Sequence, residues 1–215
     1  MLWYKAWLET RWRFVFMIGS ILLVLFTGRK PELGSALLYC VAGLFLAGAG
    51  INSQTTYAAT TGFHGSMLFT LSLPVSRRRL FFVRAGLGAL ETCALVAALA
   101  GLTLLLRPAA TSAQQLLLYA TRAVVCTMAV YALSALLACV LDEMWQFTGS
   151  CICLAAIWIL QNRIALVSQL SPLRGMSLMS YPASAPMPWG PVLASALLAG
   201  MLFWASVLVL KRKEY

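Results

Sequence analysis

Charged side chains are scarce in this sequence. Only 10% of its 215 residues are charged, whereas an ordinary soluble domain has about 25%. Together with 61% hydrophobic residues, this excludes a soluble domain and predicts an integral membrane protein. The net charge of +10 would indicate nucleic acid binding in a soluble protein. Here the cations lie at the ends of apolar blocks, as topology determinants do, so we expect no nucleic acid partner.

Histidine is almost absent, since His64 is the single one. It lies in a polar stretch, which favours an ordinary loop residue over a metal ligand or a catalytic base. The sequence also lacks a phosphate-binding G-x-x-x-x-G-K-[ST] loop and an H-E-x-x-H zinc motif. Its six cysteines fall in apolar stretches without metal-site spacing, so we expect buried free thiols. These absences predict that the chain is not an enzyme and holds no metal or cofactor.

Six apolar blocks organise the chain. They are residues 14–27, 33–52, 85–106, 116–141, a fifth block that begins at Phe147 and weakens at Gln161, and 192–210. A transmembrane helix needs about 20 apolar residues, and the first block reaches that length with the tail of the segment before it. We therefore expect an all-α integral membrane protein with six transmembrane helices, forming one domain over residues 14–215. Small-residue pairs such as Ala97-x-x-x-Gly101 and Ala196-x-x-x-Gly200 predict close helix contacts, within the chain or between copies.

Residues 1–13 are amphipathic. In a helix, Lys5, Glu9 and Arg13 share one stripe at four-residue spacing, while Trp3 and Trp7 lie on the other side. This pattern predicts an N-terminal helix that lies in the membrane interface. The alternative is a polar extension of the first transmembrane helix, and the sequence leaves both open.

Two connections are longer than turns. Residues 53–84 contain a proline turn at Pro74 and then Arg77, Arg78 and Arg79, where Ser76 is a candidate helix N-cap. Three cations in a first helical turn oppose the helix dipole, so we expect anionic phospholipid headgroups to favour them.

Residues 161–190 contain four prolines among apolar residues. Irregular backbone at membrane depth must be covered by protein or water, so this segment is an outer loop or a re-entrant hairpin.

The distribution of basic residues predicts the orientation, with both termini in the cytoplasm. Ten of the 16 basic residues then lie on the cytoplasmic side. These ten are Lys5, Arg11, Arg13, Arg77, Arg78, Arg79, Arg84, Lys211, Arg212 and Lys213, whereas Arg29, Lys30, Arg107, Arg122, Arg163 and Arg174 lie in the outer half. The expected location is the cell inner (plasma) membrane, as a multi-pass protein.

Acidic residues mark two further positions. Glu91 lies inside the third apolar block, where an ionised carboxylate must pair, take up a proton or face water. We favour pairing with a cytoplasmic arginine over a proton relay, because no second buried carboxylate or histidine accompanies it. Asp142 and Glu143 are expected to close the fourth block, at a helix end whose dipole disfavours negative charge, so we expect a basic partner for them.

The residues resemble one family. The opening Trp-Tyr-Lys-Ala-Trp-Leu-Glu-Thr-Arg-Trp-Arg-Phe, the stretch Leu-Ser-Leu-Pro-Val-Ser-Arg-Arg-Arg-Leu-Phe-Phe-Val-Arg followed by Glu91, and the six-span layout are similar to permease subunits of ABC-2 type transporters. The resemblance covers nearly the whole chain. It implies an interfacial helix before six spans, a coupling helix in the 53–84 loop, and a re-entrant segment at 161–190.

The resemblance also implies partners. The coupling loop would dock on a separate ABC ATPase subunit, which would bind ATP and Mg²⁺, and a second permease copy would pair with this one as a homodimer or as a heterodimer with a paralogue. The partner-docking residues would be His64, Met67, Leu68, Phe69, Leu71, Pro74, Arg77, Arg78 and Arg79. Apart from membrane lipid, no other partner is implied.

The expected function is therefore that of a permease subunit of an ATP-driven ABC transporter, of the exporter type. One alternative is a membrane scaffold or assembly protein that uses the same loop only to dock a cytoplasmic partner. Another is a proton-coupled carrier that uses Glu91. Because the blocks contain few charges, lipidic, peptide or drug-like cargo is more natural than a highly charged polymer.

Overall fold

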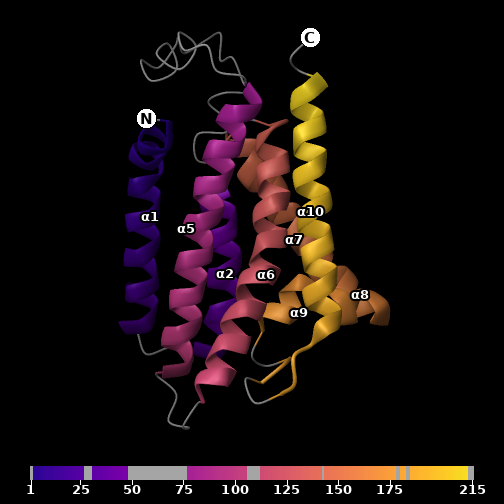
Figure 1. The fold of residues 1–215 in the computed structure, drawn as a ribbon. Coiled ribbons are helices and arrows are strands. Elements are labelled where there is room, and N and C mark those ends of the chain that lie inside the picture. Colours follow the sequence, from indigo (N-terminus) through magenta and orange to yellow (C-terminus); the bar gives the residue numbers. More distant parts are fainter. Residues whose placement is uncertain are drawn as a thin grey trace.

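The chain folds into a bundle of helices that run up and down beside one another (Figure 1). The computed structural model describes residues 2–26, 31–47, 77–105, 112–141, 143–177, 180–182 and 185–212. In these residues the regular structure is entirely helical, which confirms the all-α prediction. The helices are α1 (Leu2–Phe26), α2 (Pro31–Ala47), α5 (Arg77–Leu105), α6 (Ala113–Ala138), α7 (Glu143–Arg163), α8 (Ala165–Leu170), α9 (Pro172–Met176) and α10 (Trp189–Arg212).

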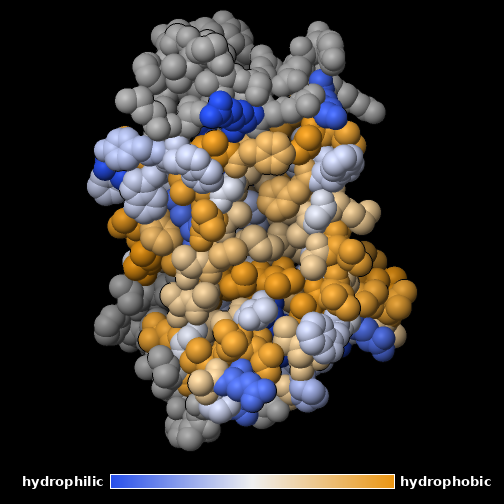
Figure 2. All heavy atoms as spheres, viewed as in Figure 1, coloured by the Kyte–Doolittle hydropathy of each residue, from blue (hydrophilic) through white to orange (hydrophobic). Residues whose placement is uncertain are grey.

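Three of these helices are long and apolar enough to cross a membrane. They are Phe81–Leu104 in α5, Ala113–Ala138 in α6 and Trp189–Lys211 in α10. They contain 23 to 26 residues. At a rise of 1.5 Å per residue, each helix is longer than the hydrocarbon thickness of a bilayer, which is about 30 Å. On the face shown in Figure 2, hydrophobic side chains predominate between the ends of the bundle and strongly hydrophilic ones gather toward the ends. The chain is thus a membrane protein, as its composition predicts.

Helix α6 lies at the centre of the bundle and packs against α2, α5, α7, α9 and α10. The largest fully buried side chains of the core include Tyr39, Tyr119 and Tyr131. Close approach depends on small residues. A Cβ atom on Gly43 of α2 would lie 3.3 Å from Thr127 Cγ2 of α6. Without a hydrophobic driving force between helices in lipid, such close van der Waals packing is what holds them together.

The start of α5 agrees with the sequence. The helix begins at Arg77, as expected, and continues to Leu105, so the last part of the 53–84 connection is helical. Ser76, the expected N-cap, lies outside the described residues. Helix α1 runs unbroken from Leu2 to Phe26, so the segments 1–13 and 14–27 form one continuous helix over its described length.

The expectation for the end of the fourth block was wrong. Helix α6 ends at Ala138, with Cys139 as its C-cap, and Glu143 is the first residue of α7. The positive end of the α7 dipole lies there, and a carboxylate is stabilised by it. The acidic pair therefore needs no basic partner on account of the helix dipole.

The 161–190 connection contains two short helices. Helix α7 ends at Arg163, α8 and α9 follow, and an irregular segment leads into α10 at Trp189. In Figure 1 both short helices lie in the half of the bundle away from the first residue of α5. A Cβ atom on Gly175 would lie 2.5 Å from Cys126 Sγ of α6 and 3.3 Å from Cβ of Pro191. The absence of a side chain at Gly175 therefore lets α9 lie directly against α6 and α10.

Candidate functional site

Glu91 is one of three charged residues that are buried among the described ones, beside Arg84 and Arg122. Its side chain is 5% exposed, and its Oε1 accepts a hydrogen bond of 2.5 Å from the Thr10 hydroxyl of α1. No partner for Oε2 is found among the described residues. The described partner of Glu91 is thus a neutral hydroxyl of another helix, and the expected pairing with an arginine stays a prediction.

Of the expected interfacial residues Lys5, Glu9 and Arg13, only Arg13 has a described side chain. Lys5 and Glu9 belong to α1, but their side chains lie outside the described part. The Arg13 guanidinium lies over the Phe45 ring of α2, 5.8 Å from its centroid. A cation over an aromatic face contributes about 0.5–2 kcal/mol, depending on solvent exposure. Arg13 therefore helps to tie α1 to α2.

The expected docking loop lies mostly outside the described residues. That applies to His64, Met67, Leu68, Phe69, Leu71 and Pro74. Arg77 and Arg78 open α5, although nothing is described of their side chains, and Arg79 is exposed in the first turn. The described part therefore places the arginines at a helix start and leaves their partner as a prediction.

Another buried charge is that of Arg122. From the sequence, Arg122 was interpreted only as one of the basic residues that set the orientation in the membrane. Its side chain is 3% exposed. Its Nη2 donates a hydrogen bond of 2.8 Å to the Tyr181 carbonyl oxygen, and the guanidinium lies 5.0 Å from the Tyr119 ring centroid and 5.9 Å from that of Tyr181. No partner for Nε is found in the described part. Arg122 therefore attaches the irregular segment before α10 to the centre of the bundle.

A pair of tyrosine hydroxyls extends this polar region toward α2. The Tyr39 and Tyr119 hydroxyl oxygens are 3.0 Å apart and share a hydrogen bond, and both side chains are buried. The signal in the sequence was the position of Arg122, six residues after the apolar block begins at Leu116. A cation so placed in a membrane helix faces the bundle interior and finds polar or aromatic neighbours.

A third polar cluster joins α6 and α7. The Gln146 Nε2 donates to the Ser134 Oγ at 2.7 Å, and the Ser150 Oγ donates to the same oxygen at 3.3 Å. All three side chains are buried. Sequence analysis missed this cluster, because isolated serines and a glutamine carry no signal until the two helices are placed side by side. Hydrogen bonds of this kind hold membrane helices together by about 0.6–2 kcal/mol each.

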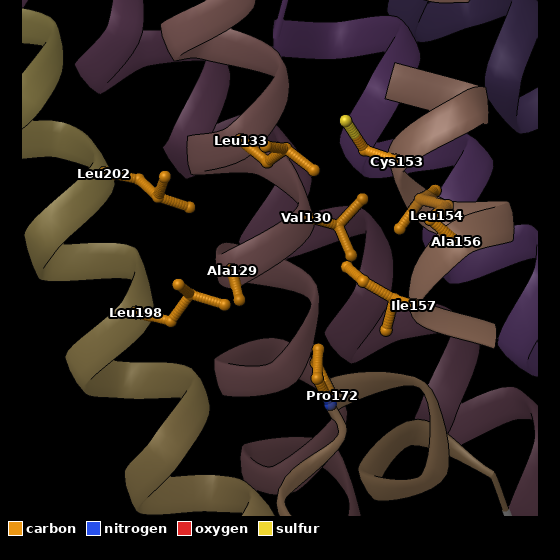
Figure 3. A pocket seen from close by; sticks show the side chains of 10 residues that line it. All are labelled: Ala129, Val130, Leu133, Cys153, Leu154, Ala156, Ile157, Pro172, Leu198 and Leu202. Carbon is orange, nitrogen blue, oxygen red and sulfur yellow. The ribbon is translucent and has the colours of Figure 1, made fainter. Parts of the chain in front are cut away.

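A cavity of about 320 Å³ lies between α6, α7 and α10. Figure 3 shows its side chains converging from these helices, with Pro172 of α9 at one end. The lining is Ala129, Val130, Leu133, Cys153, Leu154, Ala156, Ile157, Pro172, Leu198 and Leu202. Because no lining side chain is charged, the cavity suits apolar chains.

The described residues contain no group of three or more His, Cys, Asp or Glu that could hold a metal ion.

The described cysteines are free thiols, but only Cys126 and Cys139 are buried and Cys151 is exposed. The expectation that all six are buried was therefore wrong. Cys151 lies on the side of α7 that faces away from the bundle, which periodicity within a uniformly apolar helix does not reveal.

The fold and these clusters define an all-helical membrane protein with charged residues buried between its helices. Comparison with known proteins adds no family: no family model, no curated protein and no solved structure matches the chain.

Proposed function

We propose that the chain is the permease subunit of an ATP-driven ABC transporter of the ABC-2 type and works as an exporter with a separate ATPase subunit. In this proposal α1, α2, α5, α6, α7 and α10 are the six spans, and two copies pair around the path of the cargo. ATP hydrolysis in the partner moves the 53–84 loop, and that motion opens the path.

One structural observation carries the proposal. The first residue of α1, the first residue of α5 and the last residue of α10 lie at the same end of the bundle (Figure 1). The three arginines at the start of α5 are therefore at the same end as Arg212 of α10 and the charged start of α1. Such clustering is what the positive-inside rule requires of a cytoplasmic face. A loop that precedes α5 would then face a cytoplasmic ATPase.

The lengths of the remaining helices support six spans. Helix α1 has 25 residues, α7 has 21 and α2 has 17, and a transmembrane helix has about 17–25. The short helices α8 and α9 support a re-entrant segment. They follow the fifth long helix, and they lie toward the end of the bundle opposite the arginines (Figure 1).

The test begins with the full chain, affinity-purified from membranes of its native host without denaturation. If the proposal is right, it carries a vanadate-sensitive, Mg²⁺-dependent ATPase activity. The variant Arg77→Ala/Arg78→Ala/Arg79→Ala should lose most of that activity. The matched control is Lys211→Ala/Arg212→Ala, which removes cations from the same end of the bundle but outside the docking loop, and should keep it.

The outcomes separate the functions. If the wild-type chain brings no ATPase, or the control variant loses it as much as the arginine variant, the proposal is wrong. If an ATPase is present but neither reconstituted transport nor cargo-stimulated hydrolysis is found, the chain is a scaffold that docks a partner.

A proton-coupled carrier is the second candidate. The buried carboxylate of Glu91 favours it, because no hydrogen-bond partner for its Oε2 is found among the described residues. A buried acid can carry a proton between two sides of a membrane when its environment alternates. Glu91→Gln keeps an oxygen for Thr10 but cannot release a proton. Transport that persists in Glu91→Gln excludes the carrier, and transport that disappears while the ATPase stays bound supports it.

A further inference from the structure

A second cavity, of about 560 Å³, lies between α2, α7 and α9. Apart from Leu154, its lining residues differ from those of the apolar cavity of Figure 3. The helix α7 contributes to both, and Leu154 lines each of them. Its size is within the range of about 300–1,000 Å³ that is usual for ligand sites.

The cavity has an apolar part and a polar part. Ala36 and Leu37 of α2, with Leu154 and Ala155 of α7, form the apolar wall. Gln161 and Asn162 of α7 and Arg174 of α9 form the polar part. Along α7 the lining changes from apolar to polar over eight residues, which is about 12 Å of helix. This length matches the step from acyl chain to headgroup in a lipid.

The polar part is built rather than incidental. Gln161 is only 7% exposed, and its Oε1 accepts a hydrogen bond of 2.6 Å from the Ser171 hydroxyl. This bond fixes the side-chain amide. The Nε2 group of this amide has two N–H donors, which can bind an acceptor. The cavity beside it is where such an acceptor can enter.

Arg174 supplies the charge. It lies in the last turn of α9, and no acidic partner for it is found in the described part of the chain. The next residue, Gly175, lies close against Cys126 of α6, so the short helix that carries Arg174 is held in place. The cavity therefore presents one cation and one side-chain amide group at one end, and apolar walls at the other.

We propose that this cavity binds a phospholipid of the surrounding bilayer that has an anionic headgroup. One acyl chain lies along the apolar wall between α2 and α7, and the phosphate accepts hydrogen bonds from Arg174 and Gln161. Arginine is suited to this, since its planar guanidinium binds phosphate oxygens in pairs. The orientation also fits: α9, which carries Arg174, lies toward one end of the bundle (Figure 1), where headgroups are found.

The experiment uses native mass spectrometry of the full chain in detergent, titrated with phosphatidylglycerol or with phosphatidylcholine of the same acyl chains. The wild type should bind phosphatidylglycerol more tightly. Arg174→Gln should reduce that preference about fivefold, since one basic residue near an anionic lipid contributes about 1 kcal/mol. Arg174→Lys should keep most of the preference, and Ala155→Trp, which fills the apolar wall, should weaken both lipids alike.

The matched control is Arg163→Gln. This cation is exposed at the end of α7 and does not line the cavity, so the preference should remain. A phosphatidylglycerol with a photoreactive group in its acyl chain should label the α2 and α7 segments that contain residues 36–40 and 154–158. The proposal is overturned if the wild type shows no preference, if Arg163→Gln reduces it as much as Arg174→Gln does, or if Arg174→Gln leaves it unchanged. Labelling confined to other helices would overturn it as well.

Discussion

The contact of α5 with α6 at Gly88 provides the sharpest test of the packing. A Cβ atom at Gly88 would lie 2.5 Å from the Tyr131 hydroxyl oxygen and 3.1 Å from the Leu46 carbonyl oxygen. That hydroxyl is buried and donates a hydrogen bond of 2.8 Å to the Ala85 carbonyl oxygen. In Gly88→Ala the methyl group must therefore displace the hydroxyl, and the side chain of Tyr131 has no space in which to move without disturbing the core.

The magnitude follows from three contributions. Overfilling a packed core costs about 1–3 kcal/mol, and loss of a neutral buried hydrogen bond costs about 1 kcal/mol. Against these, alanine is more favourable than glycine inside a helix by about 1 kcal/mol. We expect Gly88→Ala to lower the free energy of unfolding by about 1–3 kcal/mol. The measurement is reversible unfolding of the full chain in mixed micelles, followed by circular dichroism.

Gly101 provides the control in the same helix. Nothing lies within 4 Å of a Cβ atom built there, so Gly101→Ala should be neutral or stabilising. In a Tyr131→Phe background the closest clash is removed, and Gly88→Ala should then cost clearly less, although the Leu46 carbonyl still opposes it. The reasoning fails if Gly88→Ala behaves like Gly101→Ala, or if its cost is the same with phenylalanine at position 131.

Three further predictions concern the buried polar groups and the thiols. Thr10→Val removes the hydrogen bond to Glu91 and should lower the free energy of unfolding by about 1–3 kcal/mol. In a Glu91→Leu background the same change should lower it less. Equal costs in the two backgrounds would show that the bond contributes nothing. Arg122→Leu removes a charged hydrogen bond that contributes about 1.5–3 kcal/mol. Hydrogen–deuterium exchange of the peptide that contains Tyr181 should therefore become at least about tenfold faster. Unchanged exchange would contradict the attachment of this segment by Arg122. In detergent, a maleimide should label Cys151 well before Cys126, because the first thiol is exposed and the second is buried; the reverse order would place α7 differently.

The sequence predicted the class of fold because that class depends on composition and on the length of apolar runs. The scarcity of charge and the blocks at 85–106, 116–141 and 192–210 correspond to the three helices that can cross a membrane. The start of α5 at Arg77 was also predictable, since a proline turn and a capping serine are local signals. The end of α6 was not, because the apolar run continues past Ala138 and contains no helix-terminating residue to mark the end.

The clusters between helices were harder to predict. Glu91 was recognised as important from its place in an apolar block, but its bond to Thr10 joins residues that are 81 positions apart. Within the described chain, the glycines that mediate contacts are not those of the small-residue pairs. Gly101 and Gly200 have open space beside them, whereas Gly88 and Gly175 lie close against other helices. Spacing alone cannot tell which face of a uniformly apolar helix meets a neighbour.

By itself, then, the sequence determined that this chain is a helical membrane protein, where one of its main helices begins, and which buried charge to examine first. These follow from the transfer of side chains between water and lipid and from local backbone preferences, both of which act along the chain. Only the tertiary structure decided that Arg122 attaches the segment before α10, that Gln146 meets Ser134, and that Arg174 and Gln161 share one cavity. Those contacts depend on how each helix is rotated about its axis, and in a chain apolar on every side that rotation is set by the fit of small and large side chains between helices.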